Sequence, residues 1–175
     1  MSDPHSPLRL NVGFIVAQST GYSRDFTVEI PQVRLPPDLE LTNLAGDVRV
    51  SRTPQGLLVQ AKIQGDTTLD CVRCLEPFST ILHANFTELY AFSRRNITES
   101  GLLVPDDGQI DLAPLLREIM FLELPISPLC CPECKGLCPV CGENLNFTTC
   151  NHEDEPADPR LDVLKKLLEN DNRAP

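Results

Sequence analysis

The cysteines of this chain are concentrated in two places. Six of its eight cysteines, with one of only three histidines, lie between residues 130 and 152, in CCPECKGLCPVCGENLNFTTCNH. The other two, Cys71 and Cys74, form a CVRC pair well upstream. Thiols that cluster in this way indicate bonding, because cysteines that only fill a core are scattered. In a reducing compartment such pairs are more often metal ligands or redox groups than disulfides, whereas a secretory context would favour disulfides.

The N-terminus and the hydropathy indicate the compartment. The opening MSDPHSPLRLNVGF lacks the basic n-region, the long apolar run and the cleavage site of a signal peptide. No stretch reaches the roughly 20 apolar residues that span a bilayer. We therefore expect a soluble, cytoplasmic protein without a membrane segment. Its 175 residues suffice for one domain, or for one domain with a small appendage.

The first ninety or so residues show the patterns of β-strands. Polar and apolar residues alternate in 47–51 and in 58–64, and the turn signal RTPQG stands between them. LRLNVGFIV and DFTVEI are also expected to be strands. No helix-length stretch separates these runs, which argues against parallel βαβ units. We therefore predict an α+β fold with an antiparallel β-sheet or a partly open small barrel, in which the CVRC pair lies at one hairpin end.

Two helices are predicted after the strands. In the first, Asp111 can cap, Pro114 is tolerated in the first turn, and Pro125 ends the helix. Its apolar stripe, which should cover one face of the sheet, consists of Leu112, Leu115, Leu116, Ile119, Met120 and Leu122. The second, near the C-terminus, has Asp158 as cap and Pro159 at the first position. Its stripe, which either packs on the domain or docks on a partner, comprises Leu161, Val163, Leu164, Leu167 and Leu168, and we favour packing.

These elements predict a division of the chain into two parts. Residues 1–125 would form a mainly β domain with its covering helix. Residues 126–175 would form a cysteine-rich zinc segment followed by the C-terminal amphipathic helix. We expect the second part to dock on the first, so that both behave as one unit.

The segment CPVCG at 138–142 has the form of a zinc knuckle. A CxxC turn places two sulfurs on one side of an ion, and the glycine permits the tight turn. The loop ENLNFTT is short enough to bring Cys150 and His152 back to this turn. One site is therefore predicted to consist of Cys138, Cys141, Cys150 and His152.

Cys71 and Cys74 require two further ligands for a second site. Cys134 with either Cys130 or Cys131 can supply them if the segment after the first helix crosses the hairpin end. We select Cys130, although the CPEC spacing favours Cys131, and the remaining thiol would then be free. Protein groups fill all four positions of both sites, as in structural zinc centres. Spacing alone does not distinguish zinc from an iron–sulfur cluster.

Signals for an enzyme are missing from the sequence. There is no glycine-rich phosphate loop, no GxSxG, no HExxH and no pair of carboxylates at a recognisable spacing. Neither CxxC pair lies in the βαβ context of a thioredoxin-like redox site. We identify no catalytic residue and no residue for an organic cofactor, and we expect a protein that is not an enzyme and has no small-molecule substrate.

Four stretches together resemble the YceD family. They are CVRCLEPF, IDLAPLLREIMFLELPISPLC, CKGLCPVCGENLN and DPRLDVLKKLL, in this order over roughly residues 40–170. The family consists of bacterial and plastid proteins also called large ribosomal RNA subunit accumulation proteins. Many members carry a second cysteine near the end of the cysteine segment, where this chain has His152. The resemblance implies a non-enzymatic role in ribosome biogenesis, in the synthesis, processing or stability of large-subunit (23S) ribosomal RNA.

The charge of the chain bears on its partner. With 15 Lys+Arg against 25 Asp+Glu the net charge is -10, and residues 130–158 hold six acidic side chains against the single Lys135. Such a surface repels phosphate backbones. Candidates for local RNA contact are Arg49, Arg52, Lys62, Arg73, Arg94 and Arg95. We expect contact with a ribosomal protein or a large-subunit assembly intermediate, with only weak direct RNA contact. The alternative is a zinc-stabilised protein-interaction adaptor unrelated to ribosomes.

Overall fold

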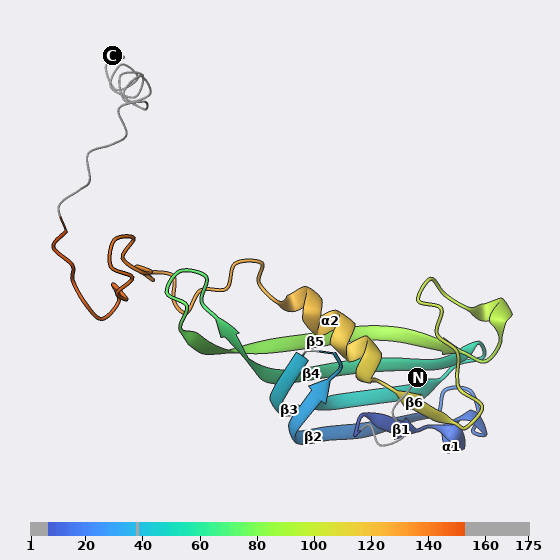
Figure 1. Cartoon of the computed structure of the whole chain (residues 1–175). Coiled ribbons are helices and arrows are strands. Elements are labelled where there is room, and N and C mark those ends of the chain that lie inside the picture. Colours follow the sequence, from blue (N-terminus) through green and yellow to red (C-terminus); the bar gives the residue numbers. More distant parts are fainter. Residues whose placement is uncertain (1–6, 38, 153–175) are drawn as a thin grey trace, which may run out of the picture. The chain divides into compact units, whose positions relative to one another are not determined.

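The computed structural model describes residues 7–37 and 39–152 (Figure 1). The chain divides into two compact units, residues 1–134 and residues 135–175. Within the described residues the helices and strands are β1 (Arg9–Asn11), α1 (Gly13–Val16), β2 (Ser23–Leu35), β3 (Leu39–Arg52), β4 (Gly56–Asp70), β5 (Pro77–Ala91), η1 (Arg94–Asn96), β6 (Gln109–Asp111) and α2 (Ala113–Glu123). The predicted C-terminal helix lies outside the described residues, and the predicted docking of residues 126–175 on residues 1–125 stays a prediction.

Four long strands form one antiparallel sheet in the order β2-β3-β4-β5. Each strand pairs with the next along the chain. Val50 lies opposite Val59 across the β3–β4 pair, which is the hairpin that the pattern in 47–64 predicted. A small second sheet pairs β1 with β6. Within the described residues β2 and β5 remain the two edges, so the sheet does not close into a barrel. The predicted α+β fold with an antiparallel sheet is thus confirmed.

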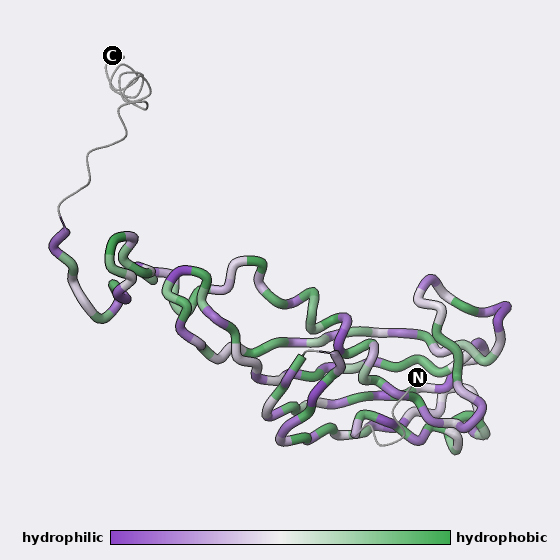
Figure 2. Tube along the Cα trace, in the orientation of Figure 1, coloured by the Kyte–Doolittle hydropathy of each residue, from purple (hydrophilic) through white to green (hydrophobic). Residues whose placement is uncertain are grey.

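The alternation of side chains gives the sheet one buried face and one exposed face. On β3, Val48 and Val50 are fully buried, whereas Asp47 and Arg49 between and before them are exposed. Successive residues of a strand point to opposite faces, so the apolar set of each strand lies together on the core side. Figure 2 shows this alternation of hydrophobic and hydrophilic residues along the strands.

Helix α2 covers the buried face and packs against β5 and β2. Leu112, just before it, and Leu116 and Met120 within it are fully buried at intervals of four residues. Asp111, the last residue of β6, accepts a hydrogen bond at Oδ1 from the N–H of Ala113 (3.0 Å). It thereby satisfies a backbone donor in the first turn of the helix. In the described part of the chain no helix is long and apolar enough to cross a membrane.

Two details of the predicted elements are wrong. Leu122 was expected in the buried stripe but is 83% exposed. It follows Met120 by two residues, which is about 200° around a helix, so it points away from the sheet. The predicted strand LRLNVGFIV ends at Asn11, and Gly13–Val16 form the short helix α1. There the N–H groups of residues 12 and 13 both donate to the carbonyl of Gly108, which ends the β-ladder.

Replacement of Leu116 by alanine tests the packing of α2. Removal of this fully buried side chain should cost about 2–5 kcal/mol of unfolding free energy, because it leaves a cavity beneath the helix. Leu122→Ala, on the same helix, is the matched control and should change the unfolding free energy by less than about 0.5 kcal/mol. Urea unfolding followed by circular dichroism measures both, and equal losses would contradict the assigned faces.

Tyr90 makes the fold sensitive to alkaline pH. Burial, with contributions from Glu88 and Asp111, raises the pKa of Tyr90 to about 12, against about 10 in an unfolded chain. Below pH 10 both states hold the phenol neutral. Between about pH 10 and 12 the unfolded state ionises first, so up to about 2–3 kcal/mol of stability is lost. Tyr90→Phe should lack this loss when unfolding in urea is compared at pH 8 and pH 11.5; an equal fall in both proteins would contradict the assignment.

Candidate metal centres

The turn that carries Cys71 and Cys74 joins β4 to β5. Strand pairing continues to the last pair, Asp70 with Pro77, so residues 71–76 form a short turn at the hairpin end. Within it, the N–H of Cys71 donates to the carbonyl of Glu76 (3.0 Å), and the N–H of Leu75 donates to the carbonyl of Cys71 (2.9 Å). These bonds fold the turn so that both sulfurs lie on one side.

The segment after α2 is tied to this turn by two hydrogen bonds. The N–H of Val72 donates to the carbonyl of Pro128 (2.9 Å). Arg73 donates from Nη1 to the carbonyl of Cys134 (2.9 Å). Together they place Cys130 and Cys134 against the turn, as the sequence analysis required for a second site.

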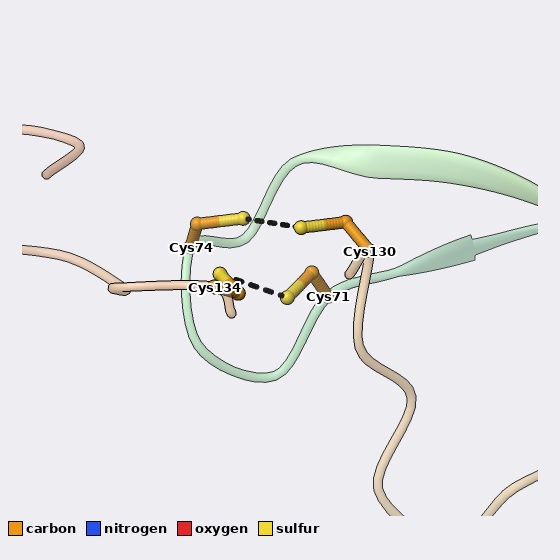
Figure 3. A group of neighbouring side chains, drawn as sticks. All are labelled: Cys71, Cys74, Cys130 and Cys134. Carbon is orange, nitrogen blue, oxygen red and sulfur yellow. Dashed lines mark hydrogen bonds between the residues drawn. The ribbon is translucent and has the colours of Figure 1, made fainter. Parts of the chain in front are cut away.

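Four sulfurs converge at this place, and Figure 3 shows them facing one another from the two segments. The Sγ atoms of Cys71 and Cys134 are 3.8 Å apart, and those of Cys74 and Cys130 are 3.7 Å apart. A tetrahedral zinc ion with Zn–S bonds of about 2.3 Å separates its sulfurs by about 3.8 Å. The spacing therefore fits a tetrahedral ion and is far too long for a disulfide, whose sulfurs lie about 2 Å apart.

The thiols of this cluster cannot all ionise by themselves. Burial raises the pKa of the Cys71 thiol, but backbone N–H groups, that of Cys130 first among them, outweigh it and lower this pKa to about 6. Burial, then the thiol of Cys134 and the other thiols, raises the pKa of Cys130 well above its ordinary value. One thiolate thus forms readily and opposes the next. A bound cation would relieve this repulsion, which is how a metal ion turns four thiols into four thiolate ligands.

Cys130 and Cys131 differ in their place relative to the cluster. The Sγ of Cys131 lies 3.9 Å from that of Cys130, but the side chain of Cys131 is exposed. The group of four whose ligand atoms lie within 4.8 Å of one another comprises Cys71, Cys74, Cys130 and Cys134. Cys131 lies outside this group, and Cys130 as the ligand stays a prediction.

The second CxxC turn, in residues 138–143, has the same backbone hydrogen bonds as the first. The N–H of Cys138 donates to the carbonyl of Glu143 (2.8 Å), and the N–H of Gly142 donates to the carbonyl of Cys138 (2.9 Å). Gly142 has φ 76°, in the left-handed region that glycine adopts at no steric cost. The turn is therefore a second knuckle, built around the predicted glycine.

The loop after this knuckle brings back the two remaining donors. The Sγ of Cys150 lies 3.5 Å from that of Cys141, and Nε2 of His152 lies 3.2 Å from the same sulfur. The hydrogen bond between the Cys150 and Cys141 thiols is the largest cause, and burial the second, that raises the pKa of Cys150 to about 12. The second group whose ligand atoms lie within 4.8 Å of one another is Cys138, Cys141, Cys150 and His152.

The structure thus brings the eight predicted residues together as two groups of four, and each group could hold a metal ion. Metal binding itself stays a prediction at this point. Sequence reasoning missed one feature of the site. Leu75 has φ 59° and occupies in the first knuckle the position that Gly142 holds in the second. The signal was present, because Leu75 and Gly142 each follow the second cysteine of a CxxC pair.

Comparison with known proteins places these residues in a family. The sequence profile described as "Large ribosomal RNA subunit accumulation protein YceD" matches residues 59–168, which include both groups of ligands. An uncharacterized protein of Mycobacterium tuberculosis is 36% identical over 128 residues, which cover 70% of this chain and 60% of that protein. No solved structure is significantly similar to the chain.

Two plant relatives carry the family's name. They are both called "Large ribosomal RNA subunit accumulation protein YCED homolog 1, chloroplastic". The one from Arabidopsis thaliana is 35% identical over 152 residues, covering 70% of this chain and 47% of that protein. The one from Zea mays is 28% identical over 133 residues, covering 58% and 45%. The chain therefore spans about half of the plant proteins and about 60% of the mycobacterial one. With a profile match over residues 59–168, the chain belongs to the YceD family.

Proposed function

We propose that the chain is a non-enzymatic, zinc-stabilised factor that supports the synthesis, processing or stability of large-subunit (23S) ribosomal RNA through contacts with protein. The observation that carries this proposal is the family match, which spans both groups of cysteines. The names of the plant relatives support the ribosomal setting. We further propose the cytoplasm as the compartment, because its reducing conditions keep thiols available as ligands.

Zinc is the metal that the donor sets support. Three cysteines with one histidine, and four cysteines, are both ordinary ligand sets of structural zinc. The sulfur separations of 3.7 and 3.8 Å in the first group match a tetrahedral ion. Bound zinc would supply folding free energy, since the chain from residue 124 to residue 152 has no helix or strand of its own. With four protein ligands per ion, no position would remain for a reacting water, which supports a structural role.

Contact through protein is supported by the way the basic side chains are used. Arg49 donates to both carboxylate oxygens of Asp25, at 2.6 and 3.0 Å. Arg52 donates from Nε to the carbonyl of Val16 and lies over the ring of Phe92. These two candidates for RNA contact are therefore already bound within the chain. A net charge of -10 further weakens attraction to phosphate.

Metal and thiol analysis of the purified full chain tests the two centres. We expect two zinc ions per chain and one titratable thiol, that of the exposed Cys131. Cys74→Ser and Cys141→Ser should each reduce the content to one zinc ion, because each removes a ligand from a different group. Cys131→Ser is the matched control and should keep two ions with no titratable thiol. One zinc ion in the unchanged protein, or iron in place of zinc, would contradict the assignment.

Disruption of the gene tests the proposed function. We expect the ratio of 23S to 16S ribosomal RNA to fall severalfold, because only the large subunit would lose its factor. A copy of the gene supplied on a plasmid should restore the ratio, whereas a copy with Cys74→Ser and Cys141→Ser should not. An unchanged ratio, together with copurification of the protein in a complex without ribosomal components, would favour the adaptor unrelated to ribosomes.

A further inference from the structure

Leucine is an unfavourable residue at position 75, both for the backbone conformation there and for the exposure of its side chain to solvent. It has φ 59°, and its side chain is 65% exposed. A left-handed conformation is sterically costly for a residue with a Cβ, and glycine or asparagine adopts it more readily. The second knuckle has Gly142 at the equivalent position. A leucine that is neither buried nor conformationally favoured contributes little to the stability of this fold. Contact with a binding partner would explain its presence.

Other exposed apolar side chains lie on the same two segments. Val72, in the same turn, is 53% exposed. Ile126 is fully exposed and lies two residues before Pro128, whose carbonyl accepts the hydrogen bond from Val72. Leu122 is exposed at the end of α2, just upstream. We call Val72, Leu75, Leu122 and Ile126 the knuckle patch. The hydrogen bond between Val72 and Pro128 holds the two segments against each other, and exposed apolar groups that lie on neighbouring segments are typical of interaction sites.

The charges around the knuckle patch are predominantly negative. Exposed carboxylates on the two segments belong to Asp70, Glu76, Glu123 and Glu133. The basic residue of the turn, Arg73, donates to the carbonyl of Cys134. A zinc ion with four thiolates would add a charge of about -2 by simple counting. Such a rim repels nucleic acid and attracts cations.

We propose that the knuckle patch binds a basic protein segment. Apolar side chains of that segment cover Val72 and Leu75, and its lysines and arginines face the four carboxylates. The apolar groups supply the burial, and the charges select a basic partner over an acidic one. This inference rests on the proposed function for the setting of the partner, which is large-subunit assembly.

Site-specific photocrosslinking of the full chain in cells tests the patch. Benzoylphenylalanine at position 75 is compared with the same probe at position 97. Ile97 is also an exposed apolar residue, but it follows the opposite end of β5. We expect at least tenfold more crosslinked protein from position 75, with mass spectrometry locating the crosslinks in segments rich in lysine, arginine and apolar residues. Crosslinks to RNA or to acidic segments, or equal yields at both positions, would overturn the inference.

Substitutions test the knuckle patch independently of the metal centre and of the proposed function. Glu76→Gln with Glu123→Gln should lower the crosslink yield at position 75 severalfold, because the carboxylates attract the partner. Asparagine adopts the left-handed backbone conformation readily, so the protein with Leu75→Asn should keep two zinc ions. A gene with Leu75→Asn should nevertheless fail to restore the ratio of 23S to 16S ribosomal RNA in the disrupted strain. A gene with the control substitution Ile97→Asn should restore it. If Leu75→Asn restores the ratio as well as the unchanged gene does, the knuckle patch is wrong while the proposed function stands. If the unchanged gene has no effect on the ratio, the proposed function fails, and the crosslinks alone decide the patch.

Discussion

The pairing of β4 with β5 determines where the chemistry of this chain can lie. The two strands remain in register from Gly56 and Ala91 to Asp70 and Pro77, so the turn between them is held at one end of the sheet. Two sulfurs in that turn lie on one side because its backbone bonds close within six residues. The chain after α2 reaches the same turn, where the carbonyl of Pro128 accepts a hydrogen bond. A local hairpin thus organises a contact between segments far apart in sequence.

The four thiols of the first group lie so close together that the negative charges of their thiolates would repel one another. Few apolar side chains surround the first group. Phe78 and Leu129 pack against it, and this small cluster is separate from the large core under α2. Thiolates in contact repel one another, and a cation would turn that repulsion into attraction. On this view the core holds the sheet and α2 together, while residues 124–152 would depend on bound ions for their order.

The two exposed surfaces of the first unit differ in chemistry. On the open face of the sheet Arg49 forms an ion pair with Asp25, so this basic side chain is matched within the chain. Around the first knuckle, apolar side chains are exposed beside four carboxylates, which outnumber Arg73, the basic residue of the turn. Matched charges keep a surface solvated, whereas an unmatched rim around apolar groups favours a partner of opposite charge. This contrast is the physical basis for separating a scaffold role of the sheet from a binding role of the knuckle.

The sequence by itself determined the features that depend on local spacing. The alternation in 47–51 and 58–64 indicated the hairpin, and the CxxC spacing indicated two knuckles and their grouping into two sets. Only the tertiary structure decided which residues of separate segments meet: Cys130 lies 3.7 Å from Cys74, although the CPEC spacing favoured Cys131. It also decided that Leu122 points outward and that Gly13–Val16 form a helix. The physical reason is that strand, helix and turn periodicities are properties of neighbouring residues. Contacts across the sheet and under α2 depend on the path of the whole chain.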